Sequence, residues 1–402
     1  MNILFVTTSN ITMNPRLGKE LKLALALGYD ATVVCFKFDN WSEKFDQDFF
    51  AENPTIQVTK ISAGRHPFLP WFCSSLFQLI SRFVWYMVPS LIVASLANDK
   101  RSYLLSKTLK EMKAKPDLII GHNLGTLAPI WAYSQRNKIP FGFDMEDYHP
   151  DELTDAVHEK KRREQIIRST LKDARYVSCS AELISKKLKS LLKGKGPGLK
   201  VVENIFPRDQ FVYCNKNNKK LNFVWFSQNI SLNRGLEKFI PILQEFDDKI
   251  KLTLIGQLNS DIRQTGLLEK DFIEILPPLC QKDLNKKICE SDVGLAIEDE
   301  KNNENRNLCL TNKIIAYYQA GLYILATDTL AQRAFIVKRQ KPGIICKNDG
   351  ASIRKALNYI LTNRAEIRQA RRQRFNDARK YCWESKSKKL SQIWKEGIND
   401  TE

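Results

Sequence analysis

A chain of 402 residues is too long for one ordinary hydrophobic core, and it predicts two or three domains, of which two is the simpler expectation. Hydrophobic residues make up 43% of the chain and aromatic residues 10%, without a low-complexity tract, which excludes an intrinsically disordered protein. The formal net charge of +18 indicates an anionic neighbour, for which nucleic acid, anionic lipid and nucleotide phosphates all qualify.

The chain opens with Met-Asn-Ile-Leu-Phe-Val, which predicts a strand rather than a secretory signal and indicates a cytoplasmic protein. Nine cysteines occur singly, without a Cys-x-x-Cys pair or a Cys/His cluster at metal-ligand spacing, so we expect reduced thiols and no metal site. No motif combines aromatic and basic residues in the manner of a nucleic-acid reader, and we therefore expect no nucleic acid partner.

Short apolar runs alternate with segments of helical period, which is typical of parallel sheets with crossover helices. The first series predicts strands over 3–7, 31–36, 56–61, 118–122, 141–146, 176–180 and 200–204. The second begins afresh at Phe223 and continues over 252–256, 273–276, 293–297, 323–326 and 343–346. The sequence therefore predicts an α/β protein with two Rossmann-like, doubly wound parallel-sheet domains facing across a cleft.

The domain boundaries follow from the polar segment between the two series. We predict a first domain over 1–206, a linker over 207–220 and a second domain over 221–380. The final segment, 381–402, is rich in Lys and Trp and is expected to form a helix that crosses back to the first domain.

The segment Phe68 to Ala97 is almost wholly apolar and has the length of a membrane span. It carries Arg82 in its middle, and Pro89 is expected to break the helix, so a pair of helices or an interfacial element is favoured over a span. Two interpretations of its aromatic residues stay open: contact with the surface of an anionic bilayer, or packing into a core.

The loop after the first predicted strand leads into a predicted helix. Asn14 is expected to be its N-cap, Pro15 its first residue and Gly28 its C-terminal stop. This helix start, with Arg16, would stabilise an anion at the ends of the strands, although a plain βα turn explains the pattern equally well.

Two later strands of the first series end in residues that suit acid–base chemistry. His122 ends the fourth predicted strand, and Asp144, Glu146 and Asp147 end the fifth. Glu146 or Asp147 would position an acceptor hydroxyl or take its proton, while simple loop capping is the alternative.

In the second half, Arg234 lies at a helix start after the loop that contains Gln228, where a guanidinium can hold a diphosphate bidentately. Further along, Thr311-Asn312-Lys313 opens another predicted helix. Thr311 is expected to cap it, and Lys313 in its first turn is electrostatically misplaced unless an anion lies there.

The order of five motifs resembles the family 4 group of GT-B glycosyltransferases, and the resemblance spans nearly the whole chain. The motifs are Met13-Asn14-Pro15-Arg16, His122 through Leu127, Asp144 through Tyr148, Asn233-Arg234-Gly235, and Thr311-Asn312-Lys313 through Gly321.

This resemblance implies a retaining glycosyltransferase that needs no obligatory metal or other cofactor and uses a nucleotide-sugar as its donor. The acceptor is expected to be a lipid-linked or polysaccharide component of the cell envelope, as in lipopolysaccharide or capsule biosynthesis, reached from the cytoplasm or from the inner face of the membrane. The predicted catalytic residues are His122, Glu146 and Asp147. The predicted donor-binding residues are Gln228, Arg234, Glu298, Thr311, Asn312 and Lys313, and the predicted acceptor-binding residues are Asn10, Asn14 and Arg16.

The chain diverges from the family at the usual pair of glutamates eight positions apart, where it carries Leu308 and Ala316. Glu298 and Glu304 lie upstream as substitutes. Two alternatives therefore stay open: a nucleotide-sugar epimerase of similar fold, and a non-catalytic partner in an envelope-assembly complex.

Overall fold

A computed structural model describes the chain except residues 114, 153, 155, 215–217, 299–303 and 400–402. Its contacts divide the chain into two compact units. The first unit comprises residues 1–203 and 387–402, and the second comprises residues 204–386.

The first unit is built on a parallel sheet with seven strands within the described residues. These strands are β1 (Asn2–Thr7), β2 (Asp30–Lys37), β3 (Gln57–Ser62), β4 (Leu118–His122), β5 (Phe141–Met145), β6 (Tyr176–Cys179) and β7 (Leu199–Val201). Their order is β3-β2-β1-β4-β5-β6-β7, so the direction of winding reverses between β1 and β4.

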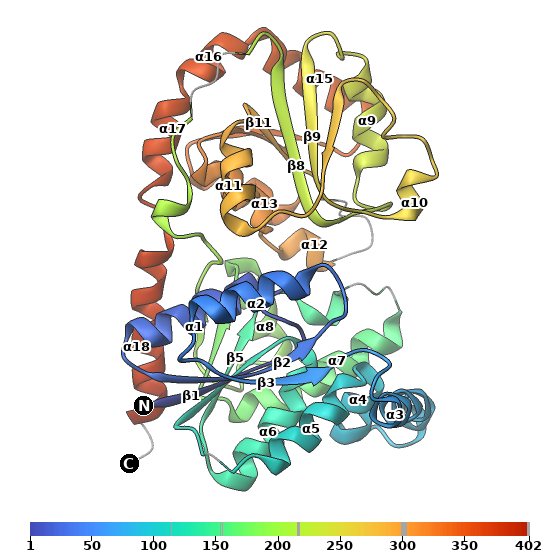
Figure 1. Cartoon of the computed structure of the whole chain (residues 1–402), viewed down its shortest axis with the longest axis vertical. Coiled ribbons are helices and arrows are strands. Elements are labelled where there is room, and N and C mark those ends of the chain that lie inside the picture. Colours follow the sequence, from blue (N-terminus) through green and yellow to red (C-terminus); the bar gives the residue numbers. More distant parts are fainter. Residues whose placement is uncertain (114, 153, 155, 215–217, 299–303, 400–402) are drawn as a thin grey trace. The chain divides into compact units, whose positions relative to one another are not determined.

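Helices cover both faces of this sheet, with α1 and α2 on one face and α5 and α6 on the other (Figure 1). The α-helices are α1 (Pro15–Ala26), α2 (Ser42–Glu52), α3 (Phe68–Met87), α4 (Leu91–Asn98), α5 (Arg101–Glu111), α6 (Leu127–Asn137), α7 (Val157–Thr170) and α8 (Glu182–Leu191). Short 3₁₀ turns are η1 (Leu124–Thr126), η2 (His149–Asp151) and η3 (Leu171–Asp173).

The second unit is built on a parallel sheet with six strands within the described part of the chain. These are β8 (Leu221–Ile230), β9 (Ile250–Leu258), β10 (Ile273–Leu276), β11 (Val293–Ala296), β12 (Tyr323–Thr327) and β13 (Gly343–Cys346). Their order is β10-β9-β8-β11-β12-β13, and the winding reverses between β8 and β11.

The helical segments of the second unit precede, connect or follow its strands. They are η4 (Arg208–Gln210), α9 (Leu236–Gln244), α10 (Ser260–Arg263), α11 (Gln281–Cys289), α12 (Glu304–Leu308), α13 (Asn312–Gln319), α14 (Leu330–Lys338), α15 (Gly350–Thr362), α16 (Arg364–Gln369) and α17 (Arg371–Ala378). The core lies between the sheet and the paired helices α9 and α15, where Trp225, Phe239 and Leu357 are buried (Figure 1).

Both predicted series of strands are present, and the predicted doubly wound α/β architecture is confirmed. The predicted strands differ from the observed ones only at their ends. Nearly continuous apolar sequence explains this agreement, because strands covered on both faces bury almost every side chain. β4 and β5, for example, are buried at every position.

The last helix among the described residues, α18 (Trp383–Asn399), belongs to the first unit from residue 387 to its end. The fully buried Trp394 lies edge-on to Phe5 of β1, with ring centroids 5.9 Å apart. Lys389 Nζ donates to the backbone carbonyl of Val201 at 3.1 Å. The first unit thus contains residues from both the N-terminal and the C-terminal part of the chain.

The predicted linker 207–220 contains η4, and its residues 215–217 lie outside the described residues.

The apolar segment 68–97 forms two helices, α3 and α4, which end and begin on either side of Pro89 as expected. Core packing of its aromatic residues is wrong as a general interpretation, because Phe68, Phe72 and Phe83 are 59%, 46% and 68% exposed. No helix among the described residues combines the length and apolarity that crossing a membrane requires.

Candidate functional site

Five charged side chains gather where the first sheet reverses its winding. Arg16 and Glu20 come from α1, His122 ends β4, Asp144 lies in β5, and Glu146 follows β5. The register places Thr7 of β1 beside His122, and His122 beside Asp144. Ligands of open α/β sheets bind at the carboxyl ends of the strands at such a reversal, so this cluster occupies the expected position of a site.

Local sequence directs the α1 side chains inward. The side chain of Asn14 accepts a hydrogen bond from the backbone N–H of Leu17 at 3.1 Å, and Pro15 occupies the first turn, so the predicted cap and first residue are confirmed. The helix ends at Ala26, and Gly28 follows with φ of 73°, consistent with the predicted stop. Because Arg16 and Glu20 are one turn apart, both lie on the buried face of α1.

The cluster is a network of short ion pairs. Arg16 Nε lies 2.5 Å from Asp144 Oδ2 and 3.4 Å from Glu20 Oε1. His122 Nε2 lies 3.2 Å from Glu20 Oε2, and its Nδ1 lies 3.2 Å from Glu146 Oε1. Arg16, Glu20, His122 and Asp144 are at most 1% exposed, whereas Glu146 is 18% exposed. Glu146 is therefore the member of the network that an incoming molecule can reach.

Burial and charge set the protonation of this network. Burial alone would lower the pKa of His122, but the charge of Glu20 and hydrogen bonds with Glu146 and Glu20 raise it to about 10. Burial raises the pKa of Asp144 to about 7, against the charge of Arg16. Burial also opposes ionisation of Glu146, yet its hydrogen bond with His122 holds the Glu146 pKa below its ordinary value. At neutral pH, His122 is thus an imidazolium and Glu146 a carboxylate.

The residues predicted to bind the acceptor have structural partners in the first unit. Asn10 is buried, donates to Ser42 Oγ at 2.6 Å and accepts from the Met13 N–H at 3.0 Å. Asn14 caps α1, and the fully buried Arg16 also donates to the carbonyl oxygen of Val202. Asp147 is half-buried in the loop after β5. Acceptor binding by Asn10, Asn14 and Arg16 stays a prediction.

His122, Asp144 and Glu146 each offer one metal-ligand atom, and these atoms lie within 4.8 Å of one another. A cation already faces this group, because the Arg16 guanidinium contacts Asp144 at 2.5 Å. The donor set therefore fits an internal ion-pair network better than a metal site. The chain also contains an Asp-x-Asp triplet, Asp46-Gln47-Asp48, but Asp46 accepts hydrogen bonds from the N–H and hydroxyl of Thr12, which is a structural role.

In the second unit, the loop between β8 and α9 also lies where the winding reverses. Arg234 donates to Ser227 Oγ at 3.1 Å, and the exposed Gln228 follows Ser227. Gly235, next to Arg234, has φ of 84°, and a Cβ there would lie 2.3 Å from Ile297 Cγ2. Only glycine fits this position without strain, because the Gly235 backbone lies tightly against Ile297, the residue that follows β11.

Lys313 lies in the first turn of α13, and its Nζ is 2.9 Å from Glu298 Oε1. Its ammonium group also lies 5.7 Å from the centre of the Trp225 ring on β8. The expected anion beside Lys313 is therefore present within the chain, and it is Glu298, whose N–H donates to Thr327 Oγ1 at the end of β12. The side chains of Lys313 and Glu298 are 12% and 10% exposed.

Thr311 occupies the N-cap position of α13, but its side chain makes no capping hydrogen bond, so its predicted capping role is wrong. Its Oγ1 and the Trp225 Nε1 are buried without a hydrogen-bond partner among the described residues. Asn312 accepts from Asn204 Nδ2 at 3.0 Å.

Of the two positions that diverge from the resembled family, Leu308 is 7% exposed and Ala316 is fully buried. Glu304 begins α12.

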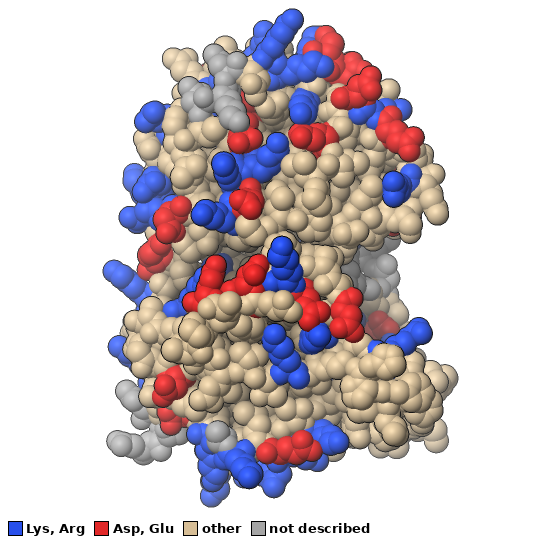
Figure 2. Space-filling view, in the orientation of Figure 1, with Lys and Arg blue, Asp and Glu red and all other residues tan. Residues whose placement is uncertain are grey.

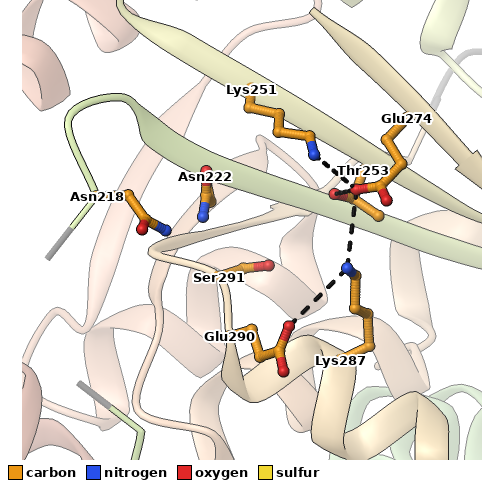
Figure 3. A pocket seen from close by; sticks show the side chains of 8 residues that line it. All are labelled: Asn218, Asn222, Lys251, Thr253, Glu274, Lys287, Glu290 and Ser291. Carbon is orange, nitrogen blue, oxygen red and sulfur yellow. Dashed lines mark hydrogen bonds and ion pairs between the residues drawn. The ribbon is translucent and has the colours of Figure 1, made fainter. Parts of the chain in front are cut away.

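A separate hollow of about 210 Å³ lies at the opposite, amino-terminal edge of the second sheet. Figure 3 shows Lys251 and Lys287 both directed at Glu274, at 3.0 and 3.7 Å. Lys287 also lies 3.9 Å from Glu290. Because the hollow lies away from the carboxyl ends of the strands, it is a weaker candidate than the Lys313 site.

Sequence reasoning missed Glu20, Ser178 and Trp225. Glu20 has the spacing of any helical residue, and Ser178 donates to Asp144 Oδ1 at 2.5 Å from the next strand. Trp225 sits inside an apolar run that predicts only core packing. The one available signal is the i, i+4 spacing of Arg16 and Glu20, which pairs opposite charges on one helix face.

Two doubly wound parallel-sheet domains with this strand order have the GT-B fold of glycosyltransferases, and the comparisons with known structures agree. Sucrose-phosphate synthase from Thermosynechococcus elongatus superposes with a TM-score of 0.73 at 10% identity and covers 100% of both chains. Anabaena HepE in complex with UDP and glucose gives 0.67 at 12% identity over 98% of this chain and 99% of its own.

A putative UDP-N-acetylglucosamine 2-epimerase from Listeria monocytogenes also superposes, with a TM-score of 0.60 at 11% identity over 100% of this chain and 97% of its own. No protein-family model and no curated protein matches the sequence. At these identities the similarity establishes the fold, and the activity has to be argued from the site.

Proposed function

We propose that this protein is a glycosyltransferase that moves a sugar from a nucleotide-sugar donor to a lipid-linked or polysaccharide acceptor of the cell envelope. The observation that carries the proposal is the pair Arg234 and Lys313, which contact Ser227 and Trp225 of the same strand, β8. Both cations lie where the second sheet reverses its winding, and Lys313 also lies at a helix N-terminus. That combination suits the diphosphate of a nucleotide-sugar.

In the proposed reaction, the bond between the anomeric carbon and the diphosphate oxygen breaks, and the diphosphate keeps the electron pair. Lys313 and Arg234 offset the charge that builds on this leaving group. The acceptor oxygen forms the new bond to the anomeric carbon on the face that the diphosphate leaves, as the proposed retention requires. Its proton passes to a carboxylate, for which we propose Glu146 or Asp147.

His122 is proposed as a positioning residue for Glu146, because its ring is fully buried and acts through the 3.2 Å contact with the Glu146 carboxylate. Gln228, Asn312 and Thr311 are proposed to complete the donor site around the phosphates and nucleoside. Glu298 is proposed to hold Lys313 in place, since the two side chains are already paired.

The donor site is tested by calorimetry with uridine, guanosine and adenosine diphosphates and their sugars. We expect one nucleotide-sugar to bind, and we expect Lys313→Gln combined with Glu298→Gln to weaken its binding by about 10- to 100-fold, the effect of one charge-assisted hydrogen bond. Changing both partners avoids a buried, uncompensated carboxylate.

The matched control is Lys338→Gln, at the exposed end of α14, which should bind the donor like the wild type. If folded wild-type protein binds none of the nucleotides, or if the double variant binds as tightly as the wild type, Lys313 does not hold a donor phosphate.

Retention at the anomeric carbon and independence of a metal are part of the proposal, and they rest on the resemblance of the motifs. Excess EDTA should leave the rate of transfer unchanged within about twofold, because Lys313 and Arg234 supply the positive charge that a metal would otherwise provide. Nuclear magnetic resonance of the product should show the anomeric configuration of the donor. Loss of activity in EDTA that magnesium restores would contradict metal independence.

An epimerase is the second candidate, favoured by the similar structure from Listeria monocytogenes. An epimerase changes the donor sugar and lengthens no acceptor, whereas a transferase releases free nucleotide together with a longer acceptor. A non-catalytic role in an envelope-assembly complex is the third, and absence of nucleotide binding would favour it. A cytoplasmic location and peripheral contact with the inner face of the membrane belong to the proposal of a transferase.

A further inference from the structure

Helix α3 buries polar residues and exposes apolar ones, the reverse of an ordinary surface helix of a globular protein. Its two buried residues are Ser74 and Ser81, which lie two turns apart on one face. Its most exposed side chains are apolar: Leu69 is 71% exposed, Phe83 68% and Met87 84%. An amphipathic surface helix normally buries such residues and exposes its polar ones.

The polar side chains of α3 form hydrogen bonds with neighbouring helices of the first unit. Gln78 and Arg82 donate to the backbone carbonyls of Asn98 and Ala97, near the end of α4, at 3.3 and 3.4 Å. The indole N–H of Trp85 donates to Gln165 of α7 at 2.7 Å. These contacts fix the helix with its apolar side outward.

The exposed apolar residues form one surface. Among the described residues, 12 of the 18 exposed large hydrophobic side chains lie between Phe68 and Ile92. We call this region the α3 surface. In Figure 2 the part of the first unit over α3, at the lower right in both views, is almost entirely free of charged side chains. A continuous exposed apolar patch of this kind marks an interaction site.

The charge around the α3 surface selects its partner. Residues 53–98 contain no Asp or Glu, but they contain Lys60, Arg65 and Arg82. Arg65 and Lys100 lie over the ring of Trp71, 5.7 and 5.4 Å from its centre. The apolar surface thus has a cationic border, within a chain of net charge +18.

We propose that the α3 surface docks the protein onto an anionic lipid bilayer, with Phe83, Met87 and their neighbours in the interface and the basic border on the lipid headgroups. A bilayer complements both the apolar and the positive character of the surface. A second copy of the chain would bring like charges together, since both copies carry +18 and a two-fold contact pairs the same patch with itself.

The test is sedimentation of the full chain with vesicles that contain about one-third phosphatidylglycerol in phosphatidylcholine, against vesicles of phosphatidylcholine alone. We expect the wild type to bind the anionic vesicles, and Phe83→Ser combined with Met87→Ser to reduce that binding at least about tenfold. Because both positions are exposed, the double variant should fold normally.

The matched control is Leu330→Ser combined with Val337→Ser, two apolar residues of the second unit that are 52% and 64% exposed. This variant should bind vesicles like the wild type. The proposal is overturned if the wild type ignores anionic vesicles or if the Phe83 and Met87 variant binds them unchanged. It is also overturned if light scattering shows a wild-type dimer that this variant dissociates, which would identify a second copy as the partner. Donor binding, measured without lipid, tests the proposed transferase separately.

Discussion

Replacing Arg16 with Met should lower the stability of the first unit by about 3–5 kcal/mol, the cost of leaving a buried ion pair with one partner. The guanidinium is fully buried and faces Asp144 and Glu20 at 2.5 and 3.4 Å. Its removal leaves three carboxylates of the network paired with His122, with Lys19 as a further cation that interacts with them. Hydrogen exchange of peptides covering β4 and β5 measures this, because it reports opening of the first unit alone.

The loss should be smaller near pH 5 than near pH 8. Burial raises the pKa of Asp144 to about 7, so this carboxyl takes up a proton at the lower pH and needs no counterion. Arg136→Met, at the exposed end of α6, removes an equal charge and should change stability by less than about 0.5 kcal/mol. Protection of β4 and β5 within about 1 kcal/mol of wild type in Arg16→Met would show that the network does not depend on Arg16.

His122 should stay protonated at pH 8 and lose its proton near pH 10, as followed by its ring resonances in nuclear magnetic resonance. The chain has four histidines, so the His122 signal is identified by its disappearance in His122→Gln. Glu20 is the largest of the groups that raise this pKa, and Glu20→Gln should therefore move the His122 midpoint toward neutrality.

The raised pKa of His122 also makes the stability of the folded protein depend on pH, in a direction that can be predicted. Since the folded pKa of His122 lies above its ordinary 6.5, the stabilisation is complete below pH 6.5 and is lost as the pH rises toward 10. The stability gap between wild type and His122→Gln should narrow over that window. Burial lowers the pKa of Lys19 to about 7, which opposes this trend, but Lys19 is present in both proteins and largely cancels in the comparison. A His122 midpoint below 7 would contradict the ion-pair network.

The architecture was predictable because its signal is local. Strands such as β4 and β5 are covered on both faces, so their apolar runs stand out from the helical segments between them. The start of α1 was equally predictable, because Asn14 and Pro15 act on backbone groups close to them in sequence. These features need no knowledge of distant residues.

The site was predictable only in part, because its partners come from separate strands. Lys313 signalled the need for an anion, yet the sequence does not show that Glu298, at the end of another strand, supplies it. Arg16 has the sequence signature of a residue at a helix start, and burial decides that it faces Asp144 instead of solvent. The α3 sequence likewise shows apolar content but not which face is exposed, because that depends on contacts of its polar residues with α4 and α7, which are distant in sequence or not signalled by it.

The edge-on packing of Trp394 against Phe5 bears on how the protein is made. A ribosome completes the strands of the first sheet when it passes Val202, but Trp394 is translated about 190 residues later, roughly 10–40 seconds at ordinary elongation rates. During that interval β1 lacks one of its largest core neighbours. The first unit therefore reaches its full stability only after the second unit has been synthesised. A chain truncated before α18 would lack this packing, and its first unit would stay less stable.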